Sequence, residues 1–185
     1  MYGIDILVDE HKNIKRMAAV MRNASLQAMQ DGEICVADFD DMKDFVRNYA
    51  DDHHHKKEEK VLFQYMQDEL GKVAENLITH GMLVEHDLGR LHMMELDKAL
   101  REYEKTQSAG ARLDIIANAT GYTYLIHRHI DKEDAVVYTF AANNLKDSSK
   151  QEVDRRTKEL EKNAKSEGIP AKYMVMLERL EQKYC

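Results

Sequence analysis

The sequence predicts an all-α protein: an up-down-up-down four-helix bundle with a C-terminal helical extension. The 185 residues include one proline and eight glycines, whereas average usage would give about nine prolines. So few helix-breaking residues leave little room for a turn-rich all-β fold. Long amphipathic segments with short connections between them complete the prediction, because four such segments form a bundle.

The four long helices are expected at about residues 4–30, 38–70, 73–105 and 111–144. Gly32, Gly71 and Gly110 mark the breaks between them, because glycine is frequent just past helix ends. We therefore assign residues 1–145 to the bundle and residues 146–185 to an extension packed on it.

The extension is predicted to contain two further helices. Ser149 and Glu152 have the spacing of a capping box, which would start a polar helix reaching about residue 165. Residues 168–170 break this helix, and a short amphipathic helix follows. Its apolar positions are Tyr173, Leu177 and Leu180. We expect the extension to cover the outside of the bundle, and a role in homo-oligomer formation or partner binding is the alternative.

Charge and cysteine content exclude several functional classes. Lys and Arg number 27 against 34 Asp and Glu, a net charge of −7. An acidic chain without a basic stripe is a poor candidate for binding nucleic acid or an anionic membrane. No apolar run approaches the roughly 18 residues of a membrane span, and no secretion signal is visible. With only Cys35 and Cys185 available, we expect a cytoplasmic protein with reduced thiols and no disulfide framework.

The fourth helix places His129 and Glu133 on its apolar face. At 100° per residue they share this face with apolar side chains. The whole stripe is Ile115, Tyr122, Leu125, His129, Glu133, Val136 and Phe140. Glutamate is rarely buried unless it is paired or bound, so this His-x3-Glu pair predicts a metal site in the core. His127 shares its face with acidic residues and is predicted to lie on the surface.

The second helix carries three consecutive histidines. His54 is in phase with Glu58, and His55 is in phase with Glu59. Phase alone does not choose between these two pairs. His53 is in phase with lysines and is expected to face solvent.

The first and third helices each add one inward histidine, His11 and His86. Four helices that each present an inward histidine, two of them followed by glutamate at i+4, predict a dinuclear metal site in the bundle core. His92 is interpreted as a packing residue, and His80 has no assigned role. Tyr122 is interpreted as a packed core tyrosine, with a hydrogen bond to a bound ligand or electron donation as the alternative.

Other chemistries have no signature in the sequence. It contains no glycine-rich phosphate loop, no G-x-S-x-G elbow and no C-x-x-C pair. The Glu-x-x-His spacing of ferritin-like di-iron bundles is also absent.

These residues resemble the pattern of the hemerythrin-like (HHE cation-binding) family over about residues 4–145. That pattern has one histidine on the first helix, His-x3-Glu on the second, one histidine on the third and His-x3-Glu on the fourth. The matching strings lie at residues 9–12, 54–63, 85–87 and 129–138. The resemblance selects the second-helix pair His54 and Glu58. The ligand set it implies is His11, His54, Glu58, His86, His129 and Glu133.

The resemblance also implies a cofactor of two non-haem irons, bridged by the two glutamates and an oxo or hydroxo group. Oxygen-carrying members have a further histidine one turn after the third-helix histidine, a position that is Arg90 here. This departure disfavours simple oxygen carriage. His55 is a candidate substitute ligand.

The function expected from these residues is binding of O2 or a related small molecule, such as peroxide or nitric oxide. The alternative on the same site is a di-iron enzyme that reduces peroxide, O2 or nitric oxide in defence against oxidative or nitrosative stress. A further alternative is an iron or redox sensor that acts through a partner.

Overall fold

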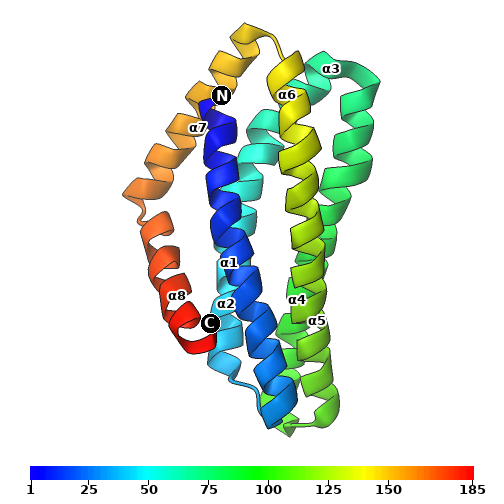
Figure 1. Cartoon of the computed structure of the whole chain (residues 1–185), viewed down its shortest axis with the longest axis vertical. Helices are drawn as coiled ribbons and strands as arrows, with labels where there is room; N and C mark the ends of the chain where they lie inside the picture. Colours follow the sequence, from blue (N-terminus) through cyan, green and yellow to red (C-terminus); the bar gives the residue numbers. More distant parts are fainter.

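The computed structural model describes residues 1–185 and contains helices but no strands. Four long helical columns run side by side (Figure 1), which confirms the predicted all-α bundle. The first column is α1 (Tyr2–Asp31). The second column runs from α2 (Val36–Phe45) to Gly71 within α3 (Phe63–Leu77), where the chain reverses, and the third continues from there through α4 (Leu83–Thr106). The fourth joins α5 (Ala109–Lys132) to α6 (Tyr138–Asn144). None of the helices combines the length and the apolar character that crossing a membrane requires.

Short π-helical segments interrupt three of the four columns. They cover Val46–His55, Glu58–Leu62, Ile78–Met82 and Glu133–Val137. Each π turn adds a residue to the helical turn and so changes which side chains face the core. Three of these segments carry some of the residues singled out above, among them His54, Glu58 and Glu133.

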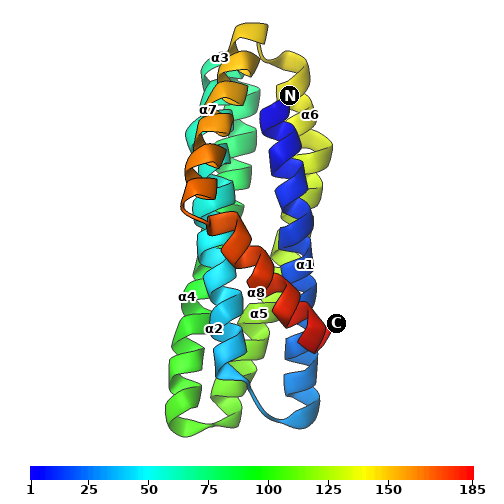
Figure 2. The same cartoon turned by 90° about the vertical axis from the view of Figure 1, so that its left-hand side faces the viewer.

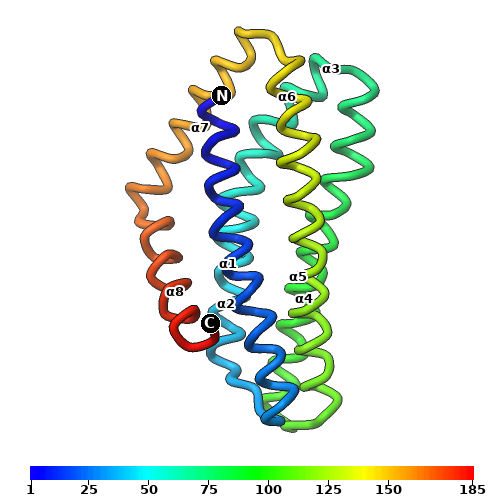
Figure 3. The backbone as a smooth tube through the Cα atoms, in the orientation of Figure 1, coloured from blue at the N-terminus to red at the C-terminus, as the bar shows by residue number.

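Two of the three predicted glycine breaks are confirmed, and the third is wrong. Gly32 ends α1 with φ of 78°, and Gly71 has φ of 63° within α3, where Figure 3 traces the chain reversing direction. Gly110 lies inside α5. The turn before it is made by Gln107 with φ of 47°, and Ser108 caps α5 by accepting a hydrogen bond from the amide of Ala111.

The extension forms α7 (Asp147–Ser166) and α8 (Ile169–Tyr184). Helix α7 packs on α1 and on the π-helical segment Glu58–Leu62, and α8 packs on α1 and α2. Figure 2 shows α8 crossing in front of α2 toward α1. Tyr173, Leu177 and Leu180 are buried as predicted. The predicted capping box is wrong: α7 begins at Asp147, and the hydroxyl of Ser149 donates to Glu69 instead. The domain division at residue 145 stays a prediction.

The apolar core is divided into two clusters along the bundle. On α1, Ile4 and Leu7 belong to one cluster, and Ile14 begins the other. On the fourth column, Val137 belongs to the same cluster as Ile4 and Leu7, and Ile130 belongs to the cluster of Ile14. The layer between the clusters is filled with polar side chains, and it holds the candidate site.

Candidate metal centre

The six histidines and glutamates of the implied ligand set meet in this polar layer. Each helical column contributes at least one of them, because the His-x3-Glu spacing and the lone histidines fall on inward faces. All are at most 2% exposed: His11, His54, Glu58, His86, His129 and Glu133. Side chains this buried need a partner for their polar atoms.

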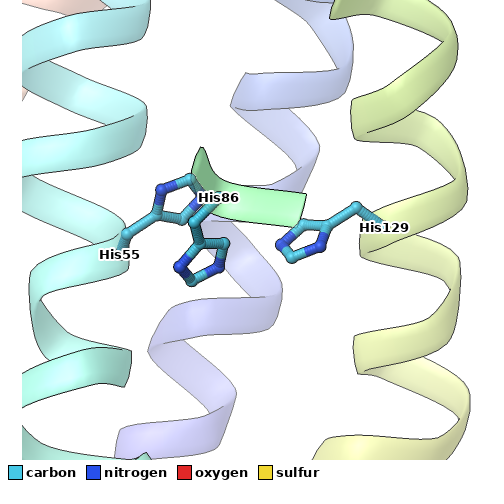
Figure 4. A group of neighbouring side chains, drawn as sticks. All are labelled: His55, His86 and His129. Atoms are coloured by element: carbon cyan, nitrogen blue, oxygen red, sulfur yellow. The ribbon is translucent and has the colours of Figure 1, made fainter. Parts of the chain in front are cut away.

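The side chains form two neighbouring groups. In the first, the ligand atoms of His11, His54, Glu58 and Glu133 all lie within 4.8 Å of one another. In the second, the same holds for His55, His86 and His129 (Figure 4), which come from three different columns. Each group has the size of a site for one metal ion.

The two glutamates face both groups. Glu133 lies 3.3 Å from His11 Nε2 through one oxygen and 3.2 Å from His129 Nε2 through the other. Glu58 Oε2 lies 3.8 Å from His54 Nε2 and 3.5 Å from His86 Nε2. The arrangement therefore offers two adjacent metal positions that share two carboxylates.

Each histidine is oriented by a carboxylate on its outer nitrogen. The Nδ1 atoms contact these carboxylates at 2.8 to 3.0 Å: His11 with Asp134, His54 with Glu10, His55 with Asp51, His86 with Glu59 and His129 with Glu85. Such a pairing places the proton on Nδ1 and leaves the Nε2 lone pair free for a metal.

Six atoms that face the centre have no hydrogen-bond partner. They are Nε2 of His55, His86 and His129, Oε2 of Glu58 and both carboxylate oxygens of Glu133. Buried polar atoms without partners are rare because they cost free energy. Imidazole and carboxylate donors are ligands that transition metals accept, and no thiolate is nearby. The residues present therefore fit a pair of metal ions.

The side chains of the centre shift one another's pKa values. Burial and the negative charge of Glu133 raise the pKa of Glu58 well above its ordinary value. Burial opposes ionisation of Glu133, yet the charge of His129 and the close contacts with His11 and His129 hold the pKa of Glu133 well below its ordinary value. Burial lowers the pKa of His54 to about 4, which favours the neutral imidazole that a metal requires.

Tyr138 is part of the centre, although sequence reasoning gave it no role. Its hydroxyl lies 2.6 Å from Glu58 Oε1 and 3.3 Å from His11 Nε2, and its ring stacks on the His11 ring. It lies five residues after Glu133, a spacing that brings it inward only across a π turn. The signal was the string at residues 129–138, which ends on this tyrosine.

His55 and Tyr122 occupy different positions relative to the centre. The ring of His55 stacks on that of His86 with centroids 3.8 Å apart, and its free Nε2 belongs to the second group. Tyr122 is buried with no partner for its hydroxyl, and it lines a cavity of about 260 Å³ together with both histidines. Arg90 lines the rim of the same cavity and is bound by Asp51, Glu59 and Asp87.

Two predictions of whether a side chain points to solvent or to the core are wrong, and the π turns explain both. His53 was expected in solvent, but it is buried, with Nε2 2.9 Å from Glu10. The π-helical segment Val46–His55 places three consecutive histidines in the interior. Val136 was expected on the apolar stripe, but it is 52% exposed, and Val137 is buried in its place. The π-helical segment Glu133–Val137 moves the inward position by one residue.

The remaining histidines lie outside both groups. His127, predicted on the surface, is half-buried, and His80 is exposed. His92 packs against Gly121, in agreement with its interpretation as a packing residue, and contacts Asn118 at 3.2 Å.

Comparison with known proteins identifies one family. The model of the Hemerythrin HHE cation binding domain matches residues 2–141. A search of curated proteins and a search of solved structures gave no match. The matched range covers both groups of candidate ligands, and helices α7 and α8 follow it.

Proposed function

The chain belongs to the hemerythrin HHE cation-binding domain family, and on this premise we propose that it is a non-haem di-iron protein that binds O2 or a related small molecule. The observation that carries the proposal is the set of six unpartnered buried atoms that face one another in the bundle centre. A pair of irons would satisfy them, and imidazole with carboxylate suits iron.

In this proposal, His11 and His54 would hold one ion, and His86 and His129 the other, with His55 as a further ligand on the side where Arg90 replaces a histidine. Glu58 and Glu133 lie within reach of both groups. Bound iron would supply redox chemistry and open coordination positions for a small ligand. The protein orients the imidazoles through their carboxylates, and the apolar clusters on either side exclude bulk water.

The test is the iron content of two single variants. His54→Ala and His129→Ala each lower the bound iron sharply, measured by elemental analysis after anaerobic loading. His127→Ala is the control, because this histidine belongs to neither group, and it keeps the wild-type iron content. Circular dichroism verifies that the variants remain helical. Two irons per chain in both ligand variants would show that the site assignment is wrong.

A second candidate function is reduction of peroxide, O2 or nitric oxide at the same site, and the cavity beside His55 and His86 favours it. Its volume of about 260 Å³ far exceeds the roughly 30 Å³ that one water molecule occupies in the liquid. Optical spectra of the anaerobically reduced, iron-loaded protein before and after O2 separate the two functions. A stable coloured species that reverses on removing O2 indicates binding. Rapid conversion to an oxidised di-iron spectrum, with turnover of added peroxide, indicates the enzyme.

A further inference from the structure

A second group of buried polar side chains lies beside the metal centre. Glu10, His53, Lys57 and Glu161 are between 2% and 8% exposed. The ammonium of Lys57 forms ion pairs with Glu10 and with Glu161, the latter at 2.5 Å, and lies 3.1 Å from His53 Nε2. A lysine is almost never this buried unless it is paired, so the two carboxylates are what hold Lys57 inside.

This group is not a third metal site. Glu10, His53 and Glu161 are close enough together to hold an ion, but the Lys57 ammonium already lies among them and supplies the positive charge. The cluster is therefore a closed ion network of this chain's own side chains, and its role lies in what it positions.

Glu10 connects this network to the metal centre. One of its oxygens accepts hydrogen bonds from Lys57 and the other lies 2.9 Å from His54 Nδ1. The opposite nitrogen of His54 faces Glu58. A continuous series of contacts thus runs from Glu161 through Lys57 and Glu10 to a candidate metal ligand.

Glu161 comes from outside the matched domain. It lies on α7, beyond the matched residues 2–141. Packing of α7 on α1 delivers it: Thr157 and Val153 lie against Gly3, whose amide donates a hydrogen bond to Asp154 at 2.8 Å. The docked extension therefore supplies one end of the series of contacts that reaches His54.

We propose that Glu161 is a positioning residue for the metal centre. Glu161 holds Lys57 and, through Lys57 and Glu10, orients the imidazole of His54. Docking of α7 and metal binding therefore favour one another. This inference rests on the proposed metal site. Coupling between two sites is reciprocal in binding free energy, so metal binding also stabilises the docked extension.

The first test uses Co²⁺ as a spectroscopic probe in the full-length chain. Glu161→Leu leaves Lys57 and Glu10 as a balanced ion pair, so the fold persists. Glu161→Leu weakens binding of one of the two Co²⁺ ions by about 10-fold or more, the range for lost partners of metal ligands, and alters the visible absorption of the bound Co²⁺. Glu161→Gln, which still accepts a hydrogen bond from Lys57, restores part of the affinity.

The matched control is Glu159→Leu on the same helix, because Glu159 is exposed and contacts only Arg155. It binds both Co²⁺ ions as the wild type does. Equal Co²⁺ affinity and equal spectra for wild type and Glu161→Leu overturn the positioning role alone. Absence of Co²⁺ and iron binding by the wild type overturns the proposed function and this inference together.

The second test measures the reciprocal effect by limited trypsin digestion. Lys162 and Lys165 are exposed near the end of α7. Co²⁺ slows cleavage there in the wild type, and Glu161→Leu loses this protection. Cleavage at the same rate with and without Co²⁺ in the wild type, while both ions are bound, overturns the coupling.

Discussion

Among single residues, Tyr138 has the closest contact with the shared carboxylates. Its hydroxyl donates to one oxygen of Glu58, while the other oxygen of Glu58 has no partner. In the metal-free protein this hydrogen bond helps to stabilise a carboxyl group that has lost all contact with water.

Tyr138→Phe is therefore expected to lower the free energy of unfolding of the metal-free protein by about 1–3 kcal/mol, the cost of leaving a buried polar group unsatisfied. Urea unfolding measures the change. Tyr124→Phe is the control, because Tyr124 is 57% exposed, and it changes stability little. Equal effects of the two substitutions would contradict this role of Tyr138.

His129 gives the metal-free protein a defined pH dependence. Burial lowers its pKa, but the charge of Glu133 and the hydrogen bond to Glu85 outweigh burial and raise it to about 9. Protonated His129 therefore stabilises the folded state. This contribution is complete at pH values below the pKa of the unfolded chain, near 6.5, and it is lost as the pH rises through the folded-state pKa of about 9. We expect the free energy of unfolding to fall by up to about 3 kcal/mol across this range.

Urea unfolding of the metal-free protein at pH 6 and pH 9.5 measures this loss, and His129→Gln is expected to show a flatter profile. Because a metal needs the neutral imidazole, metal loading near pH 7 also releases this proton, which calorimetry in buffers of different ionisation enthalpy detects. Identical pH profiles for wild type and His129→Gln would argue against the assignment to His129.

At the scale of helices, the π turns explain how much the sequence could predict. Helical phase placed His11, His86, His129 and Glu133 in the interior, because the three histidines lie in regular α-helix and Glu133 is the first residue of its π segment. It failed for His53 and Val136, whose positions depend on where the extra residue is accommodated. That choice is made by packing between helices, which a single-helix phase argument does not contain.

The carboxylates that orient the histidines were beyond sequence reasoning for a related reason. Asp134 lies 123 residues from His11 along the chain, and Glu10 lies 44 residues from His54. Such pairs follow from which helices are neighbours and at what height. The buried Lys57 was likewise unpredictable, because one of its counter-charges comes from the extension.

Helices α4 and α5 approach each other closely at Gly121. A Cβ added there would lie 2.6 Å from Cε1 of His92. The His92 ring must move to admit this Cβ, which costs free energy through overpacking. Gly121→Ala is therefore expected to lose most or all of the roughly 1 kcal/mol that alanine otherwise adds to helix stability. Adding His92→Ala in the same chain removes the clash and restores part of the loss.

Thermal unfolding of the two variants checks this expectation, with Gly81→Ala as the control. A Cβ at Gly81 meets nothing within 4 Å, and alanine is a better helix former than glycine by about 1 kcal/mol. If Gly81→Ala and Gly121→Ala changed stability alike, close packing at Gly121 would not be the cause.

At the scale of the whole molecule, the two apolar clusters contain 28 and 14 buried residues, and the polar centre separates them. We expect the clusters to hold the bundle together when no metal is bound. The centre contains two glutamates and five histidines. Without a metal, the two carboxylates repel each other, and six inward atoms have no hydrogen-bond partner.

Removal of metal with a chelator is therefore expected to lower the melting temperature while the helical circular dichroism at 20 °C is retained. Added iron(II) under anaerobic conditions restores the melting temperature in a concentration-dependent way, as expected for a ligand that binds only the folded state. An unchanged melting temperature on adding the metal would contradict a metal centre in the core.

The carboxylates paired with the five histidines differ in their access to water. The side chains of Asp134, Asp51, Glu59 and Glu85 are between 18% and 35% exposed, whereas that of Glu10 is 8% exposed. Four imidazole Nδ1 protons therefore have a short relay to solvent, and the fifth, on His54, does not. In deuterated water the Nδ1 hydrogen of His54 should be the last of the five to be replaced by deuterium.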